Sequence, residues 1–449
     1  MHAAFDENAL ALGAFSAKVA ERARHLQDGV ALASLASGRS AVDKEFGVLI
    51  RRLAGRGLLE YRLGRASDDD PVVIEPQVAD YWPRMPKLGG GNRLVLSRFA
   101  YMRRRGDAMV VESPLAGALF MIRDPNVAAT VALLSTPQRV KQLRWQGGFP
   151  GDELLALMVD CRLLVAANIA GEADEDVPEG DDHLALWDFH DLLFHTRSTE
   201  GRQASPVGGT YASAGAIAPL PAVRVHWPGK KIGLGRFSEK SAPSPLVRLM
   251  QQRHSARSFD DRKPITLAEL AQVLHDSARV ISRWSDRVDL GDAGPVVTYA
   301  MRPYPSAGAS YELELYLAVD HCEGLPRGFY HYDAGAHVLV PIASSPQNLQ
   351  TMLTEAAFAM DARGVPQILI TIAARFGRVS WKYSGLAYAL ILKNVGVLTQ
   401  TLYLMATDMG LGGCAIGSTN IDLFARMTGI EFHVEGPVGL FALGREALP

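Results

Sequence analysis

The sequence has few cysteines and no excess of charge of either sign. Its three cysteines, Cys161, Cys322 and Cys414, lie far apart and form no Cys-x-x-Cys pair. This spacing excludes the usual zinc and disulfide frameworks and fits a reducing cytoplasm. Because 46 lysines and arginines nearly balance 48 aspartates and glutamates, the overall charge favours neither a nucleic-acid coat nor an acidic tail. We expect a cytoplasmic protein without a nucleic-acid partner.

A long apolar run is also missing. Lys393, Asn394 and Asp408 interrupt the most hydrophobic stretch, residues 383–411, so its longest uncharged run falls short of the roughly 20 apolar residues that a membrane span requires. The first residues carry an early Asp-Glu pair instead of the basic and then apolar order of a signal peptide. The sequence therefore predicts neither a membrane protein nor an exported one, and it predicts a buried helix over residues 383–411.

The chain is long enough for two or three domains, since 449 residues, 48% of them hydrophobic, exceed one ordinary core. Apolar residues at helical spacing run into a strand-like tail in residues 44–64 and again in residues 151–168. This apparent duplication predicts two winged-helix-like domains. An acidic stretch and a segment rich in glycine, proline, alanine and serine follow them. The predicted bounds are two winged-helix-like domains at 1–88 and 89–172, a linker with a connecting helix at 173–243, and a C-terminal domain at 244–449.

The C-terminal domain carries clear secondary-structure signals. Ser244 and Pro245 offer an N-cap and a first-turn proline for one helix. Thr266 and Glu269 form a capping box for a second helix. Apolar alternation or continuous apolar runs predict strands at 312–319, 367–376 and 436–444. Helices and strands are therefore mixed, and the predicted fold class is α+β.

Several segments of this domain have the composition of ligand sites. Residues 253–259 (RHSARSF) suit a phosphate and the polar edge of a planar ring, with a solvated helix end as the alternative. Residues 305–317 contain small residues that allow close approach of a ligand, as ordinary tight loops also do. Residues 410–420 contain four glycines whose amides could face a flavin; a helix C-cap explains one glycine more easily than four. Arg445, after the last strand, could close over a phosphate.

Lys382 and Tyr383 stand at the expected start of the long helix. A lysine at a helix N-terminus opposes the macrodipole, so its presence there indicates a need for the amine. Burial at that position would favour the neutral amine, which can act as a base. A surface lysine beside a packed tyrosine is the structural alternative.

The remaining candidates for metal or redox chemistry are isolated. His190 and His195 are five residues apart and lack a nearby carboxylate pattern for zinc. We interpret them as structural and predict no metal site. Cys414, within the glycine-rich segment, is interpreted as a small buried residue.

In their order along the chain, RHSARSF, YPSAGASYELELYL, WKYSGLAYALILKNVGVLTQTLYLMATDMGLGGCAIG and GLFALG resemble the SagB-type dehydrogenases of the nitroreductase superfamily. The resemblance covers residues 246–449, and LWDFHDLLFHTRS upstream is also similar to the family. It implies a nitroreductase-like FMN domain that oxidises azolines to thiazoles or oxazoles in ribosomally made, post-translationally modified peptides.

The resemblance also implies roles for individual residues. Lys382 and Tyr383 match the family's catalytic pair. The residues implied to bind FMN are Arg253, His254, Ser255 and Arg257 at the phosphate, ribityl chain and pyrimidine edge, Ser306 and Gly308 near the isoalloxazine, Ala415, Ile416 and Gly417 under N5, and Arg445 at the phosphate.

The implied partners are an azoline-containing precursor peptide, a cyclodehydratase complex and a second copy of the chain. The family's subunits form a two-fold dimer with FMN at the interface, which a long apolar helix would suit. The two N-terminal domains resemble peptide-recognition domains that hold a leader peptide by strand addition.

Three other functions remain open at this point. The first is an NAD(P)H-dependent, nitroreductase-like flavin reductase that acts on small molecules. The second is a DNA-binding regulator, suggested by the winged-helix pattern and by the basic run Arg103, Arg104 and Arg105, although no recognition helix is basic along its length. The third is a flavin-free scaffold in a peptide-modifying complex.

Overall fold

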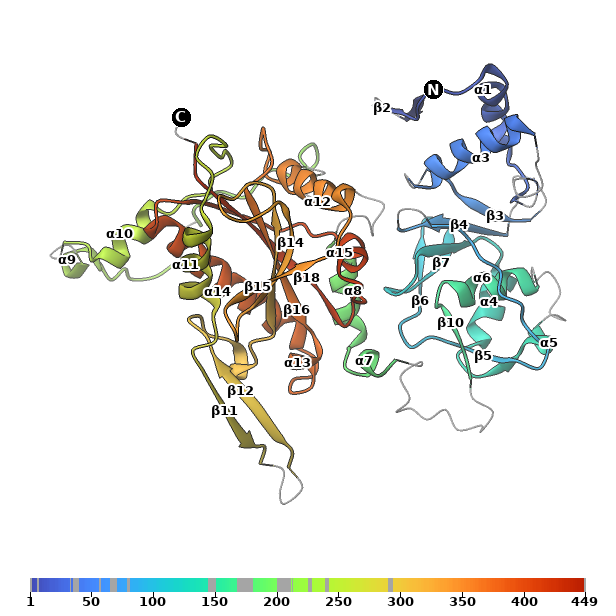
Figure 1. Ribbon diagram of the computed structural model, residues 1–449. Helices are drawn as coiled ribbons and strands as arrows, with labels where there is room; N and C mark the ends of the chain where they lie inside the picture. The colour runs from blue at the N-terminus through green and yellow to red at the C-terminus, as the bar shows by residue number, and fades with distance from the viewer. Residues whose placement is uncertain are drawn as a thin grey trace. The chain divides into compact units, whose positions relative to one another are not determined.

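The protein is seen in a computed structural model that divides into two compact units (Figure 1). The first unit comprises residues 1–185 and 201–204, and the second comprises residues 186–200 and 205–449. The connecting helix predicted within 173–243 therefore belongs to the second unit. The structure describes residues 2–5, 8–32, 34, 40–55, 58–64, 71–78, 81–143, 151–167, 181–199, 211, 213–224, 228–238, 242–289 and 294–447. Most of the acidic stretch and parts of the following connector lie outside these residues.

The first unit begins with a small helical core. A hairpin of β1 (His2–Phe5) and β2 (Asn8–Ala11) precedes α1 (Ala17–Arg24), a 3-10 turn η1 (His25–Asp28) and α3 (Ala41–Ala54). Ser40 and Asp43 cap α3 reciprocally, which satisfies amide groups that a helix start leaves unpaired. The buried side chains that hold α1 and α3 together are Leu12, Val19, Phe46, Leu49, Ile50 and Leu53.

The rest of the first unit contains two antiparallel sheets and three further helices that pack around one core. One sheet has the order β3-β4-β8-β7-β6 and the other β10-β5-β9. The strands are β3 (Tyr61–Leu63), β4 (Val72–Pro76), β5 (Arg93–Leu96), β6 (Tyr101–Arg105), β7 (Ala108–Glu112), β8 (Ala118–Ile122), β9 (Gln138–Arg139) and β10 (Leu164–Ala166). The helices are α4 (Pro125–Leu133), α5 (Val140–Leu143) and α6 (Asp152–Asp160), and α7 (Asp182–Ala185) ends the unit.

The two segments that suggested a duplication each form a helix followed by a strand, as predicted. In the first, α3 is followed by β3, and in the second α6 is followed by β10. Their pairing differs, because β3 pairs with the next strand, β4, whereas β10 pairs with β5, which precedes α6. Since β4 also pairs with β8, one sheet crosses the boundary that we place at residue 88. The division into two winged-helix-like domains remains a proposal.

The second unit is built on a six-stranded sheet in which all neighbours are antiparallel, with the order β15-β14-β13-β16-β18-β17. The strands are β13 (Leu313–Val319), β14 (Gly328–Asp333), β15 (Val338–Ile342), β16 (Ile368–Arg375), β17 (Gly412–Ile416) and β18 (Glu435–Gly444). Every residue of β16 from Ile368 to Ala374 is buried, which confirms the predicted central strand. The predicted α+β class is also correct.

Helices cover this sheet. α12 (Pro346–Ala359) and α15 (Ile421–Thr428) share a hydrophobic core with its strands, while α14 (Ala387–Asp408) lies against β17 and β18. α11 (Leu267–Ala278) packs on α14 and begins with the predicted capping box. The remaining helices are α8 (Phe189–Arg197), α9 (Gly235–Ser238), α10 (Pro245–Gln252) and α13 (Gly377–Ser380), with a 3-10 turn η2 (Ala307–Ala309). Ser244 caps α10, with Pro245 in its first turn, as predicted.

A two-stranded hairpin extends from this domain (Figure 1). β11 (Ser282–Arg287) and β12 (Val296–Met301) pair only with each other among the described strands. All of β11 is exposed, and Trp284 stacks on Tyr299 across the hairpin. The sequence analysis did not predict this hairpin.

The apolar helix α14 is long enough and apolar enough to cross a membrane by length and composition. One face of it is buried within the domain, and this face includes Tyr388, Asn394, Leu398 and Tyr403. Packing against two strands, β17 and β18, and against the helices α8, α10, α11 and α13 gives the same composition a role in the core. The expected buried helix is therefore present, although it begins at Ala387 rather than near residue 383.

Candidate active site

One group of predicted site residues gathers around Tyr403 of α14. Ser255 Oγ and the Tyr403 hydroxyl share a hydrogen bond of 2.8 Å, and the Ala415 amide donates to the same hydroxyl at 2.8 Å. The guanidinium of Arg253 lies 5.1 Å from the centre of the Tyr403 ring, a distance at which a cation is attracted to the ring face. Sequence reasoning missed Tyr403, although a tyrosine on the buried face of an apolar helix is a usable signal because its hydroxyl needs a partner.

The cationic side chains in this group divide into paired and unpaired ones. Arg445 forms a 2.6 Å ion pair with Glu269, and His254 Nε2 lies 2.8 Å from the Glu446 carboxylate. The hydrogen bond from Glu446 raises the pKa of His254. Within the residues that the structure describes, Arg253 and Arg257 form no ion pair. Two arginines thus stay available to an anionic ligand, whereas the sequence analysis assigned Arg445 and His254 equally to the phosphate.

The glycine-rich segment forms the edge strand β17 in place of the expected open loop. A side chain at Gly412 would place its Cβ 2.6 Å from Ala256 Cβ, and one at Gly413 would place it 2.4 Å from the Phe441 ring. These two glycines are therefore explained by packing against protein. At the end of the strand Ile416 is buried, whereas Ala415 and Gly417 are exposed. At this end of the strand, Ala415 and Gly417 present an open surface to a ligand.

A second group brings the predicted catalytic pair to the small-residue loop. Lys382 Nζ donates to the Gly308 carbonyl at 3.2 Å. Gly308 has φ of +57°, and a Cβ there would stand 2.3 Å from the Tyr383 hydroxyl and 2.7 Å from Lys382 Nζ. Lys382 Nζ also lies 5.8 Å from the centre of the Tyr299 ring. The absence of a side chain at Gly308 is what lets both reactive groups converge there.

A buried polar network supports this loop from beneath. Asn394 of α14 accepts from the Ala307 amide at 3.1 Å and donates to Glu312 at 2.8 Å and to Ser306 Oγ at 3.2 Å. Ser306 in turn donates to Glu312 at 3.2 Å and accepts from the Tyr311 amide at 3.0 Å. Glu312 is fully buried, and this burial raises the pKa of its carboxyl. Sequence reasoning found Ser306 but missed Asn394 and Glu312.

The surroundings of Lys382 differ from those that the sequence predicted. Lys382 and Tyr383 lie between α13 and α14, not on the first turn of the long helix, and the Lys382 side chain is exposed. A helix dipole and burial therefore do not explain the lysine. Its observed neighbours are the Gly308 carbonyl and two tyrosine rings, Tyr299 and Tyr383.

The two groups are separate. Asn394 and Tyr403 are nine residues apart on α14, which corresponds to about 14 Å at a rise of roughly 1.5 Å per residue. A ligand that used both groups of one chain would have to be extended. Otherwise each group would serve a different ligand.

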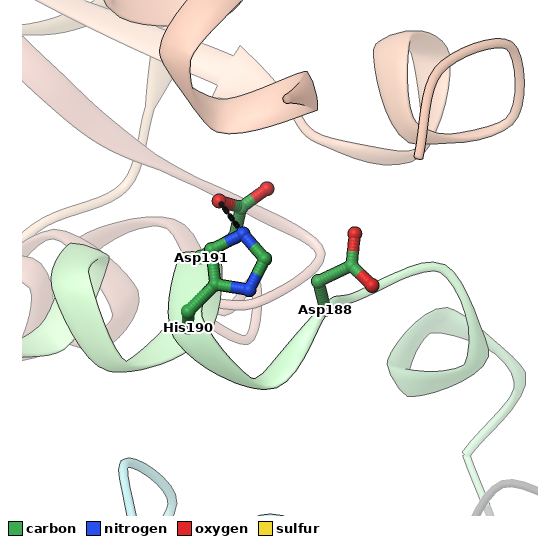
Figure 2. Close-up of side chains that lie close together, drawn as sticks. All are labelled: Asp188, His190 and Asp191. Atoms are coloured by element: carbon green, nitrogen blue, oxygen red, sulfur yellow. Dashed lines mark ion pairs between the residues drawn. The ribbon is translucent and has the colours of Figure 1, made fainter. Parts of the chain in front are cut away.

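The histidines upstream occupy different surroundings. His195 is buried, and its Nδ1 lies 3.1 Å from the Tyr388 hydroxyl, as a structural histidine would. His190 is exposed and lies beside the carboxylates of Asp188 and Asp191, and its interpretation as a structural residue remains a prediction. Figure 2 shows that Asp188, His190 and Asp191 project from the start of α8, and their ligand atoms lie within 4.8 Å of one another. Both aspartates already accept backbone amides of the α14 region.

Two family models match successive parts of the chain. The model described as cyanobactin oxidase ThcOx matches residues 94–204. The model of the nitroreductase family matches residues 250–445. The second match contains every residue of the two groups described above except Glu446.

Curated relatives are similar to parts of this chain. A nitroreductase-type protein of Methanocaldococcus jannaschii is 28% identical over 201 residues, which cover 45% of this chain and 91% of that protein. The microcin B17-processing protein McbC of Escherichia coli is 30% identical over 115 residues, which cover 24% of this chain and only 42% of McbC.

Solved structures are also similar, although their TM-scores are low. A nitroreductase from Ralstonia eutropha is 21% identical, covers 52% of this chain and 100% of its own, and gives a TM-score of 0.35. The Escherichia coli microcin synthetase McbBCD complex, solved with truncated pro-MccB17, is 18% identical, covers 60% and 97%, and gives a TM-score of 0.41. The chain therefore combines a segment similar to cyanobactin oxidase ThcOx with a C-terminal segment that matches the nitroreductase family, which agrees with the resemblance to SagB-type dehydrogenases.

Proposed function

We propose that this protein is an FMN-dependent oxidase that converts azolines in a ribosomally made peptide to thiazoles or oxazoles. The observation that carries the proposal is the convergence of Lys382 and Tyr383 on Gly308 above a buried polar network. The matches to cyanobactin oxidase ThcOx and to the microcin B17-processing protein support the peptide substrate.

The residues around Tyr403 fit the proposed cofactor. Among the residues that the structure describes, Arg253 and Arg257 have no acid partner, and their charge suits a phosphate. The exposed residues Ala415 and Gly417 offer a planar ring system a surface with small or absent side chains. When bound, FMN supplies the acceptor for the two electrons that an azoline loses as it becomes aromatic.

The chain's own contribution is to move a proton. The Cα proton of an azoline is acidified by the adjacent C=N and carbonyl groups. In the proposal Lys382 Nζ or the Tyr383 hydroxyl accepts this proton while the neighbouring ring carbon loses a hydride. The Gly308 carbonyl holds the ammonium group that a protonated Lys382 would form.

We also propose a homodimer with FMN at its interface. The groups around Tyr403 and Asn394 are well separated on α14, so a symmetric dimer could join one group of each subunit. Only 33% of the most apolar window of α14 is buried within the chain, and a helix with that much uncovered apolar surface suits an interface. In a dimer the second subunit covers this apolar surface, so α14 needs no membrane around it. This agrees with the cytoplasmic location proposed from the composition.

The first unit is proposed to recognise the precursor peptide and to contact a cyclodehydratase partner. β6 stands at one edge of its sheet, where an extended peptide can add a strand. Arg103 pairs with Glu112 and Arg105 pairs with Glu75, both at 2.6 Å. These ion pairs neutralise most of the basic run that suggested a DNA-binding regulator.

A flavin reductase for small molecules is the second candidate. It is favoured by the likeness to the Methanocaldococcus jannaschii protein, 91% of which is matched by 45% of this chain. Rapid bleaching of the flavin by NADPH, coupled to turnover of a nitroaromatic compound, would support this candidate over azoline oxidation.

The decisive experiment measures anaerobic bleaching of the flavin by a peptide that contains a thiazoline or oxazoline. Lys382→Ala and Tyr383→Phe should retain FMN and lose at least 100-fold in this rate. If both variants keep FMN and the full rate, the proposed base is wrong. A colourless protein that does not take up FMN would instead support the flavin-free scaffold.

A further inference from the structure

The start of α14 has no cap from its own sequence. The residue at the N-cap is Leu386, whose side chain accepts no hydrogen bond. The first amide groups of any α-helix lack partners within the helix and need acceptors from elsewhere. This need is larger for α14 than for a short surface helix because its N-terminal residues Ala387 and Tyr388 are buried.

Asp188, the residue before α8, and Asp191 of α8 accept backbone amides at this end of α14, from Gly385 just before the N-cap and from Tyr388 in the first turn. Asp188 Oδ2 accepts from the Gly385 amide at 2.5 Å, and Asp191 Oδ2 accepts from the Tyr388 amide at 3.2 Å. Asp191 is itself buried, with 8% of its surface exposed. Carboxylates at this end also complement the positive pole of the helix macrodipole. A helix about 200 residues away in sequence therefore completes the start of α14.

α8 and the turn before it are themselves held firmly against the same domain. The Trp187 indole donates to the His433 carbonyl at 2.8 Å, and its ring centre lies 4.6 Å from that of Phe376. His195 Nδ1 lies 3.1 Å from the Tyr388 hydroxyl. These contacts fix α8 on both sides of the two aspartates, so their positions are determined by packing.

The segment that this arrangement fixes is the one that carries the proposed catalytic pair. Residues 381–386 connect α13 to α14 and include Lys382 and Tyr383. At its beginning, the Tyr383 amide donates to the Val379 carbonyl at 2.9 Å. At its end, Gly385 is held by Asp188. Six residues restrained at both ends have little freedom to move their side chains away from Gly308.

We propose that Asp188 and Asp191 are positioning residues for azoline oxidation: they cap α14 from α8 and thereby hold Lys382 and Tyr383 at Gly308. The inference rests on the proposed function, because it takes Lys382 and Tyr383 as the reacting pair. It also assigns a role to the LWDFHD segment, which lies outside the nitroreductase family match.

A metal ion is the competing explanation for the same side chains. Asp188, His190 and Asp191 could together offer three ligand atoms (Figure 2). Each carboxylate, however, already uses one oxygen to accept a backbone amide, and His190 Nε2 lies 3.1 Å from Asp191 as a simple pair. Capping of α14 explains the positions of both aspartates without a metal ion, and the His190 side chain takes no part in the capping.

The test compares alanine and asparagine variants of the full-length, FMN-loaded protein. In Asp188→Ala and Asp191→Ala, amide hydrogen exchange at Gly385 and Tyr388 should rise at least 10-fold, while amides of β16 stay unchanged. The rate of flavin bleaching by an azoline peptide should fall at least 10-fold, whereas FMN content and the rate of flavin reoxidation by oxygen should not change. Asp188→Asn and Asp191→Asn should recover most of the bleaching rate, because a carboxamide oxygen still accepts the amide.

His190→Ala is the matched control on the same helix and should leave all these quantities unchanged. A loss of activity in His190→Ala equal to that of the aspartate variants would favour the metal and overturn the cap. If the amides of Gly385 and Tyr388 exchange at the wild-type rate in the alanine variants, the proposed cap is also overturned. Faster exchange with an unchanged bleaching rate would refute the positioning role. A wild-type protein that no azoline peptide bleaches would refute the proposed function, and the exchange rates would still decide whether α8 caps α14.

Discussion

The groups around Tyr403 and Asn394 lie on the same helix but differ in charge and in burial. Near Tyr403 the ligand-facing groups are cationic and exposed at least in part, and two of the arginines have no acid partner among the described residues. Near Asn394 the polar groups are buried and bonded to one another. The first group carries positive charge that an anionic ligand would neutralise. In the second group the polar side chains already form hydrogen bonds with one another. Changes to the first should affect binding, and changes to the second should affect rate or stability.

The largest expected effect is on cofactor binding. The double variant Arg253→Ala with Arg257→Ala should weaken FMN binding at least 100-fold, since each charge-assisted hydrogen bond contributes about 1.5–3 kcal/mol and about 1.4 kcal/mol is a factor of ten. Fluorescence titration of FMN into the apoprotein measures this. Arg445→Ala is the control and should cost less than 10-fold, because Arg445 is already paired with Glu269. Equal losses of FMN affinity in the double variant and in Arg445→Ala would show that pairing with an acid does not decide which arginines bind FMN.

A substitution at Gly308 should reduce the rate and spare binding. In Gly308→Ala the new methyl group would meet the Tyr383 hydroxyl and Lys382 Nζ at a backbone φ of +57°, so the azoline-driven bleaching rate should fall about 10-fold or more for a displacement of this kind. FMN affinity should stay within a few-fold of wild type. Gly364→Ala, where a Cβ meets nothing within 4 Å, controls for loss of a glycine. A bleaching rate unaffected by Gly308→Ala would show that Gly308 does not set the geometry.

The buried network should contribute mainly to stability. Asn394→Ala leaves the Ala307 amide and the Glu312 carboxylate short of partners, which should lower the free energy of unfolding by about 1–3 kcal/mol. Urea denaturation followed by far-UV circular dichroism measures this loss. Thr401→Ala, which alters an exposed hydroxyl of the same helix, should change the free energy by less than about 0.5 kcal/mol.

Glu312 adds a pH dependence to the same measurement. Burial raises the pKa of Glu312 in the folded protein above its ordinary value of 4.5. A raised pKa means that stability from this group is complete below pH 4.5 and is lost as the pH rises through the raised value. Glu312→Gln should remove that part of the pH dependence. An identical pH profile of the unfolding free energy in both proteins would refute the assignment.

The smallest expected effect concerns His254. The hydrogen bond from Glu446 raises the pKa of His254 above its ordinary value of 6.5, so the cationic form persists to higher pH. If His254 faces the phosphate, FMN affinity should decrease a few-fold as the pH rises through that pKa. Titrations at several pH values check this, and in His254→Gln the decrease should disappear. Persistence of the decrease in His254→Gln would assign it to another group.

Local signals in the sequence were enough for many elements of the second unit. The capping box of Thr266 and Glu269, the cap and proline at the start of α10, and the buried strand β16 all have the predicted positions. Each of these depends on residues within a few positions of one another, because caps and apolar periodicity are set by the local backbone. The start of α14 was misplaced by a few residues because its cap comes from α8 and not from neighbouring residues.

By itself, the sequence determined the α+β class and the order of the candidate motifs, since composition and spacing along the chain carry that information. Only the tertiary structure decided which candidates meet. Asn394 reaches Glu312 across 82 positions, Ser255 reaches Tyr403 across 148, and Gly385 reaches Asp188 across 197. No local pattern encodes these distances, because they depend on how strands and helices pack around the sheet. That packing also pairs Arg445 and His254 with acids, whereas Arg253 and Arg257 have none in the described part of the chain.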